Sequence, residues 1–280
     1  MPLSAELRAM LCGLWRRREK NSGLYRQLQG FRSQAVIRGG IKPCRSITDR
    51  HPFDELSEPR MYCPPAFVEN DHDTIAEMIR SYPFGVLITC DQGRSEVTHL
   101  PFMLHLGKTV QGQGQGKGKL IGHIARANPQ WQHFAHGEEV LVVFQGPHTY
   151  ISPSWYTNFG VPTWNYAAVH VWGTVRLIED EASLNAMLIE LTETHEAARP
   201  TPWVFDIDPE RRAHLMAMLV GFEIDITDIQ ATFKFNQNRS EQDRAGVIAA
   251  LSLSPDADDQ AVACLMREQM TSRKKAGTNE

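Results

Sequence analysis

Short apolar runs separated by turn-forming residues recur through the middle of this 280-residue chain, and they constrain its fold more than any other feature. Short apolar runs bounded by Gly, Pro, Asn or Asp are typical of β-strands. Strands are predicted over residues 84–90, 97–106, 120–125, 139–145 and 163–178, with one or two more within 220–235. Pro101 interrupts the second run, which predicts an edge strand or a bulge there. The sequence therefore predicts a mainly β protein with peripheral helices, arranged as a barrel plus helices.

Helical periodicity is found at the borders of this strand series. Residues 71–81 place Ile75, Met78 and Ile79 at helical spacing, and Asp71 or Asp73 can cap the helix. Residues 179–197 turn four apolar side chains to one face: Leu184, Met187, Leu188 and Leu191. Other helices are predicted over 4–20, 128–134, 210–218, 240–251 and 259–270. The segment 111–119, QGQGQGKGK, is predicted to be a hairpin tip, because no helix pattern follows it to make a phosphate loop.

Charge divides the chain into two parts. Residues 1–60 hold 12 Lys and Arg against 6 Asp and Glu, whereas the rest holds 17 against 27. An acidic body repels a phosphate backbone, so DNA binding by the globular part is not favoured. We expect 1–60 to be a poorly ordered basic extension or a wrongly assigned start, with a nucleic-acid arm or a transit peptide as alternatives. A main domain is predicted over 61–251, followed by a helix and charged tail over 252–280.

Cysteine spacing and hydropathy indicate where in the cell the protein is found. The five cysteines lie far apart, and no Cys or His pair stands at metal-ligand spacing. Reduced thiols predict a cytoplasmic protein without a metal. No apolar run approaches the roughly 20 residues that a membrane helix needs, so no membrane association is expected.

Two segments, 121–131 and 144–166, concentrate polar and aromatic side chains between predicted strands. The first contains His123, Arg126 and Asn128, and the second contains Trp155 and Trp164. Aromatic surface beside a guanidinium suits a ligand with a planar ring at one end and an anion at the other. The alternative is structural: tryptophans in the core, and an arginine that binds local carbonyls.

Several motifs resemble the PaiB family: MYCPPAFVEND from Met61, THLPF from Thr98, GHIARANPQW from Gly122, VVFQGPHTYISPSWY from Val142, VPTWNYAAVH from Val161 and VGFEIDIT from Val220. The resemblance covers roughly residues 61–251. It implies an FMN-binding split β-barrel of the pyridoxamine-phosphate-oxidase-like kind, a homodimer with FMN between two barrels, and a family named as transcriptional regulators. One departure is local: where the family reads KFKLSQN, this chain has Thr232 in place of the first Lys and Asn236 in place of Ser.

Candidate FMN contacts follow from the resemblance together with residue chemistry. Arg126 is the first choice for the phosphate, because its planar guanidinium offers two parallel N–H bonds; binding to nearby carbonyls is the alternative. Asn128 is a phosphate-side partner or the N-cap of the helix entered through Pro129. The remaining candidates are His123; Thr98, His99, Leu100 and Pro101, whose strand backbone could meet the flavin edge; Trp164 and Asn165 as a wall; and Lys234 and Gln237, reaching FMN on the partner subunit.

The resemblance leaves several functions open. The first is an FMN binder or redox sensor acting as a negative transcriptional regulator, and the alternative is an FMN-dependent oxidoreductase for a small substrate. A minor alternative is haem binding through His99 or His123. No nucleophile with a matching base stands out, so catalytic residues are not predicted, and any catalysis would be carried by the flavin.

Overall fold

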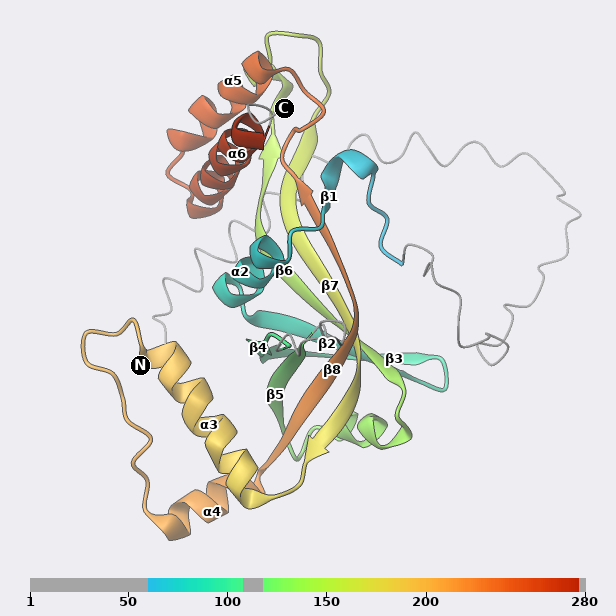
Figure 1. The fold of residues 1–280 in the computed structure, drawn as a ribbon, viewed down its shortest axis with the longest axis vertical. Coiled ribbons are helices and arrows are strands. Elements are labelled where there is room, and N and C mark those ends of the chain that lie inside the picture. Colours follow the sequence, from blue (N-terminus) through green and yellow to red (C-terminus); the bar gives the residue numbers. More distant parts are fainter. Residues whose placement is uncertain (1–59, 108–117, 277–280) are drawn as a thin grey trace, which may run out of the picture. The chain divides into compact units, whose positions relative to one another are not determined.

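One eight-stranded antiparallel sheet organises the chain in the computed structural model, which describes residues 60–107 and 118–276 (Figure 1). The expectations for residues 1–59 and for the glycine-rich tip at 108–117 lie outside the described residues. All described residues belong to one compact unit.

The strands follow the predicted series closely. They are β1 (Val68–Glu69), β2 (Phe84–Asp91), β3 (Arg94–Pro101), β4 (Met103–His105), β5 (Lys119–Ala125), β6 (Glu139–Ile151), β7 (Thr163–Ile178) and β8 (Leu219–Lys234). Their order in the sheet is β3-β2-β6-β7-β8-β5-β4, with β1 added on β8. Only Phe102 separates the two end strands β3 and β4 in the chain, and β3 lies against β5. The sheet therefore curls on itself without a ladder between its two ends, which makes it a split β-barrel, as predicted.

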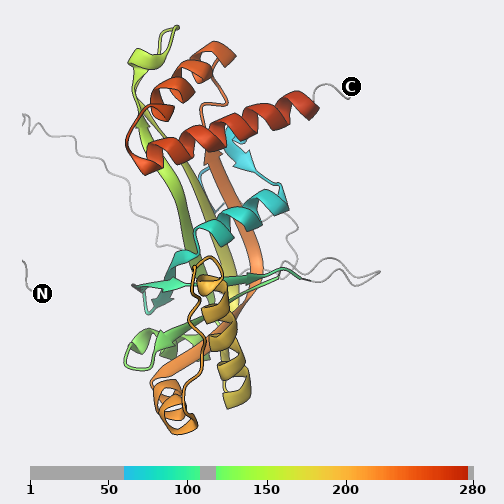
Figure 2. The same cartoon turned by 90° about the vertical axis from the view of Figure 1, so that its left-hand side faces the viewer.

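The helices lie at the periphery. They are α2 (His72–Ser81), α3 (Glu181–Glu196), α4 (Pro209–Ala217), α5 (Glu241–Ser252) and α6 (Ala257–Ala276), with the short 3-10 helices η3 (Pro65–Phe67), η4 (Pro129–His136) and η5 (Pro153–Trp155). Asp71, Asp180 and Ser240 accept hydrogen bonds from the first turns of α2, α3 and α5, so the caps expected at Asp71 and Ser240 are confirmed. Helices α2, α3 and α6 lie on the same side of the long strands (Figure 2).

Two apolar clusters hold these layers together. The larger joins the strands to α2, α5 and α6 and includes Phe102, Phe144, Phe222, Val262 and Met266. The smaller packs the predicted face of α3 against β4 and β5: Leu184, Met187, Leu188 and Leu191 against Met103 and Ile121. The apolar face expected for residues 179–197 is therefore confirmed.

Two strand predictions are corrected by the structure. The run 97–106 is two strands rather than one, because the chain leaves β3 at Pro101 and the Phe102 N–H donates to the Pro83 carbonyl instead of a strand partner. Strand β6 continues past 145 to Ile151, because a register shift between Gln145 and His148 accommodates Pro147, which has no N–H to donate.

Strands β7 and β8 determine where the candidate residues lie. Each has 16 residues, which span up to about 50 Å when extended. Helix α4 packs on β8, which begins two residues after α4 ends, whereas α5 begins soon after β8 ends and packs on α6 and η5 (Figure 1). Residues at opposite ends of β8 are therefore far apart within one chain.

Candidate functional site

Arg126 lies in the turn after β5 with its side chain exposed and its guanidinium fixed. Its Nε donates to the Ala217 carbonyl and its Nη2 to the Leu219 carbonyl, both at 2.9 Å, and its backbone N–H donates to Met218. The guanidinium also lies 5.9 Å from the centre of the Trp131 ring. The carbonyl partners considered from the sequence are thus present. They use the Nε–Nη2 edge and leave the Nη1 side of the fork to other ligands.

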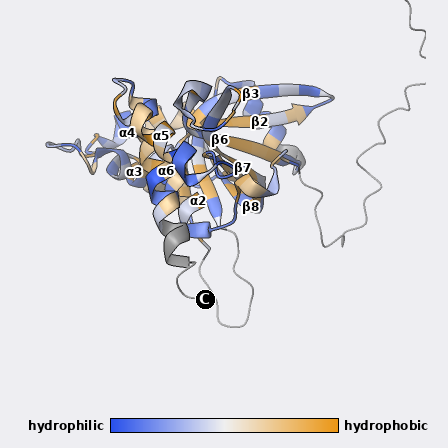
Figure 3. Ribbon diagram, turned by 90° about the horizontal axis from the view of Figure 1, so that it is seen from above, coloured by the Kyte–Doolittle hydropathy of each residue, from blue (hydrophilic) through white to orange (hydrophobic). Residues whose placement is uncertain are grey.

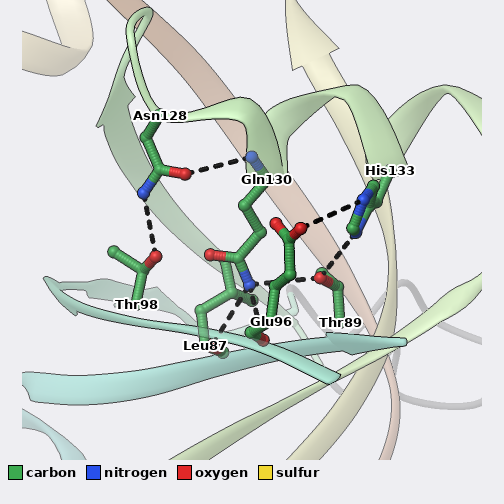
Figure 4. A network of polar contacts seen from close by, with 7 residues as sticks. All are labelled: Leu87, Thr89, Glu96, Thr98, Asn128, Gln130 and His133. Carbon is green, nitrogen blue, oxygen red and sulfur yellow. Dashed lines mark hydrogen bonds and ion pairs between the residues drawn. The ribbon is translucent and has the colours of Figure 1, made fainter. Parts of the chain in front are cut away.

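Asn128 connects η4 to strand β3 (Figure 4). Its Oδ1 accepts from the Gln130 backbone N–H at 3.0 Å, so the predicted N-cap is observed. Its Nδ2 donates to Thr98 Oγ1 at 2.9 Å. Two of the candidate residues, Asn128 and Thr98, are therefore brought together, and through them the turn that carries Arg126 is attached to β3.

Strand β3 is an edge of the sheet, as Pro101 predicted. Among the described strands it pairs only with β2, so one row of its backbone N–H and C=O groups has no strand partner. His99 is exposed and stacks on Phe84 with ring centres 6.2 Å apart, whereas Leu100 is buried in the barrel core. The strand can thus offer its backbone and His99 to a ligand, but not the Leu100 side chain.

His123 lies on a different face from the other candidates. Its strand partner is Gly221, and a Cβ on Gly221 would contact Leu184 and Met187 of α3, so the His123 side chain faces the α3 layer. Burial lowers its pKa, and its buried Nδ1 has no hydrogen-bond partner among the described residues. A neutral imidazole packed toward α3 is the result, separate from His99 on the outer side of β3.

The candidates from β7 diverge from one another. Trp164 is 53% exposed and stacks near His148, with ring centres 6.2 Å apart. Asn165 is fully buried and donates to Asn236 and to the Met266 sulfur of α6. Because alternate residues of a strand face opposite sides, only Trp164 offers surface to a ligand.

Lys234 and Gln237 lie at the far end of β8. Lys234 Nζ donates to Thr163 Oγ1 at 2.6 Å, and burial lowers its pKa. Gln237 Oε1 accepts from the Phe235 N–H at 2.7 Å, and its Nε2 donates to the Phe233 carbonyl. Gln237 therefore stabilises the turn after β8, and of these two candidates only Lys234 carries a positive charge.

The candidates thus form two groups. Arg126, Asn128, Thr98 and His99 lie near the start of β8 and the edge strand β3, whereas Trp164 and Lys234 lie where β8 ends. Leu219, which Arg126 contacts, and Lys234 lie 15 positions apart at the two ends of β8, which is up to about 50 Å along an extended strand. One ligand cannot contact both groups of the same chain.

Four polar residues near Arg126 were not predicted. Gln130 is fully buried, and His133 Nδ1 lies 2.9 Å from Thr89 Oγ1, with its Nε2 3.8 Å from Glu96 (Figure 4). The sequence signal was a glutamine in the first turn of a proline-initiated helix, but its partners lie 34 to 43 residues away, so only the fold brings them together. Among the described residues, no group of three or more His, Cys, Asp or Glu side chains is placed to hold a metal ion.

The fold and the candidate residues define a class of protein: a split β-barrel in which an exposed guanidinium, fixed by backbone carbonyls, lies near an edge strand. The chain belongs to the PaiB family, because the family model described as "Putative FMN-binding domain" matches residues 61–228. The Bacillus subtilis "Protease synthase and sporulation protein PAI 2" is 37% identical over 211 residues, which cover 75% of this chain and 98% of that protein. FMN is the cofactor of this family's domain.

Other relatives are more distant. An uncharacterized protein of Emericella nidulans is 30% identical over 246 residues, which cover 75% of this chain and 97% of that protein. The flavocytochrome Anf3 of Azotobacter vinelandii has 15% identity and a TM-score of 0.46, over 64% of this chain and 75% of its own. An FAD and haem binding protein of Mycobacterium smegmatis has 14% identity and a TM-score of 0.46, over 64% and 78%. No helix of the described part is long and apolar enough to cross a membrane.

The residues present fit FMN. A phosphate dianion needs a cation that no carboxylate neutralises, and among the described residues no carboxylate pairs with Arg126. A flavin edge needs hydrogen-bonding groups, and the backbone groups of β3 that have no strand partner among the described residues are of this kind.

Proposed function

We propose that this protein binds FMN with the phosphate at Arg126 and the flavin ring along the open edge of β3. The observation that carries the proposal is the Arg126 guanidinium, fixed by two carbonyls and exposed on its other side. A side chain already held in place loses little conformational entropy when it binds a ligand. Asn128, through Thr98, keeps this cation close to β3, so the two ends of one ligand can be bound together.

We further propose that the protein acts as a homodimer. The two groups of candidate residues are too far apart in one chain, whereas a two-fold dimer can place the Trp164 and Lys234 end of one subunit against the Arg126 end of the other. Trp164 would then form a wall beside the ring, and Lys234 would supply a second positive charge. FMN itself, when bound, supplies the capacity to accept and donate hydride.

An apolar sheet face supports the dimer. On β2, β3, β6 and β7, side chains that alternate with the core positions form what we call the outer sheet face: Val86, Ile88, Val97, His99, Leu141, Val143 and His170. Trp172 points to the same side but is already buried, with the Arg60 guanidinium over its ring. Strands β2 and β6 are hydrophobic over much of their length (Figure 3). Strands that face water on one side usually alternate with polar residues, so an apolar outer face favours burial against another surface.

The cellular output proposed is regulatory, with the flavin or its redox state as the signal. The Bacillus subtilis relative is named for protease synthesis and sporulation, which supports a role in gene regulation by analogy alone. The acidic body, with 17 Lys and Arg against 27 Asp and Glu over residues 61–280, favours an indirect effect over DNA binding by the barrel. The cytoplasmic location stays a prediction.

Two measurements separate a sensor from an oxidoreductase. The purified protein should show the absorption bands of a bound flavin, and anaerobic NADH or NADPH should then be added. A flavin that is retained but not turned over by nicotinamides fits the regulatory proposal. Rapid bleaching with repeated turnover would instead establish the FMN-dependent oxidoreductase.

Replacing Arg126 tests the phosphate site. Arg126→Ala should weaken FMN binding by about 1.5–3 kcal/mol, the typical value of a hydrogen bond to a charged group, and leave riboflavin binding nearly unchanged. Fluorescence quenching titrations with both ligands measure this. Arg199→Ala, at an exposed arginine after α3, is the control. Equal losses for FMN and riboflavin would contradict the assignment.

A further inference from the structure

Gln130 is the most completely buried polar residue near the proposed phosphate site. Its side chain has no exposed surface, and its Nε2 lies 3.0 Å from the Glu96 carbonyl, 3.2 Å from Thr89 Oγ1 and 3.4 Å from the Leu87 carbonyl. Two of these three neighbours are obligate acceptors, which determines the orientation of the amide: the NH₂ group faces them. Its Oε1 has no partner among the described residues.

The hydroxyl of Thr89 extends this contact to a second side chain of η4. If Thr89 Oγ1 accepts from Gln130, its own proton is directed at His133 Nδ1, 2.9 Å away. His133 Nδ1 then accepts this hydrogen bond, and its Nε2 lies 3.8 Å from a Glu96 carboxylate oxygen. Gln130 and His133 therefore bind both strands of the β2–β3 hairpin through one connected network (Figure 4).

The other end of the same segment is attached to β8. The Arg126 backbone N–H donates to the Met218 carbonyl at 2.8 Å, and the Trp131 indole N–H donates back to the Arg126 carbonyl at 3.0 Å. Arg126 thus lies between two attachments, one at the start of β8 and one at the β2–β3 hairpin. Asn128 contributes to the second attachment through the Thr98 hydroxyl, but Gln130 is the η4 side chain that contacts the backbone of both hairpin strands.

We infer that Gln130 is a positioning residue, which sets the distance between Arg126 and the open edge of β3 and so makes the site select flavins that carry a phosphate. This inference rests on the proposed FMN function and names what that site discriminates: FMN against riboflavin. Loss of the Gln130 amide would remove the contacts between η4 and the backbone of both hairpin strands and would let η4 shift relative to β3. Arg126 would keep its charge but no longer meet the phosphate while the ring lies on β3.

The test compares FMN with riboflavin, which lacks the phosphate, in three full-length proteins: the wild type, Gln130→Met and Gln132→Met. Methionine keeps the size of glutamine and removes its hydrogen bonds, and Gln132 is an exposed residue of the same helix. The ratio of the riboflavin Kd to the FMN Kd should fall roughly tenfold in Gln130→Met, the lower end of the loss seen when partners that orient a metal ligand are removed. It should not change in Gln132→Met. Thermal melts without flavin establish that each variant is folded.

Each failure has its own signature. A high ratio in the wild type that is unchanged in folded Gln130→Met overturns the positioning role and leaves the proposed function intact. A wild type that binds flavin but does not distinguish FMN from riboflavin overturns the phosphate site, and the inference with it. If Gln130→Met does not fold, Gln130→Asn keeps the amide on a side chain one methylene shorter, and the same fall in the ratio is expected.

Discussion

A buried carboxylate, Asp243, holds the loop between β6 and β7 in place. Its Oδ1 accepts from the backbone N–H groups of Thr157 and Asn158 at 2.8 and 3.1 Å and from the Thr157 hydroxyl at 2.9 Å. Burial alone would raise the pKa of Asp243, but the hydrogen bonds from Asn158, Thr157 and Ser240 outweigh it and hold the pKa far below its usual range. The ionised carboxylate therefore stabilises the loop that leads to Trp164, and protonation would weaken these hydrogen bonds.

The sign of the pH effect follows from this depressed pKa. An aspartate in the unfolded chain titrates near 3.9, so the stabilisation by Asp243 is complete above about pH 5 and is lost as the pH falls toward the folded-state pKa. Asp243→Asn should lower the Tm at pH 7 and flatten the decrease of Tm below pH 4. Thermal melts from pH 7 to pH 2 measure this, with Glu193→Gln, at an exposed residue of α3, as the control. An unchanged acid limb in Asp243→Asn would contradict the assignment.

Arg126 illustrates how far a residue type can be interpreted before the fold is known. A guanidinium has five N–H donors, so the two roles considered for it, binding carbonyls and binding a phosphate, do not exclude each other. The contacts with Ala217 and Leu219 use one edge of the fork. Residue chemistry therefore predicts the donors, but the fold decides which of them a ligand can reach.

At the scale of elements, the starts of helices were predicted best, because capping residues and prolines mark them in the sequence. The extents of the long strands were predicted worst. Asp71, Asn128 and Ser240 cap the helices that begin beside them, because a cap needs only local chain geometry. The unity of β8 depends on its pairing with β5, more than 60 residues away in the chain, and the length of β6 depends on its pairing with β7 beyond the register shift, so periodicity alone did not determine them. The bulges that let these strands bend are tertiary features as well.

Strands β7 and β8 approach each other so closely at Gly173 that only glycine fits there. The pairing register of the two strands shifts between Trp172 and Gly173, and a Cβ on Gly173 would lie 2.5 Å from the Asp225 carbonyl oxygen. Gly173→Ala should therefore destabilise the protein by about 1–3 kcal/mol, the range for overpacked sites. Urea unfolding measures this loss, and Thr174→Ala, the next residue of the same strand, is the control. Wild-type stability in Gly173→Ala would mean that the two strands can separate at the bulge without cost.

At the scale of the whole molecule, the outer sheet face predicts the assembly. Val143 lies near its centre, paired with Val86 on one side and His170 on the other. Burial lowers the pKa of His170, so this imidazole adds no positive charge to the face at neutral pH. A second subunit would cover an apolar surface here, which supplies the driving force for association.

A charge at the centre of this face tests the dimer. Val143→Lys should convert a dimer into a monomer, because a lysine ammonium would be buried without a partner, and FMN affinity should fall with it. Light scattering after size exclusion measures the mass. Leu253→Lys, at a leucine 88% exposed after α5, should remain dimeric. A monomeric wild type at micromolar concentration would refute the two-subunit site.

By itself, the sequence determined the class of fold, the positions of most helices and strands, and the family with its cofactor, because alternation, capping and motif all act over short stretches of chain. The tertiary structure decided which side chains share a site. It turned Asn165 into the core beneath α6, directed His123 toward α3, brought Gln130 to the β2–β3 hairpin, and separated Arg126 from Lys234 by the length of β8. The physical reason is that a side chain's partners are set by strand register and by which face of the sheet it occupies, and both depend on pairings between distant parts of the chain.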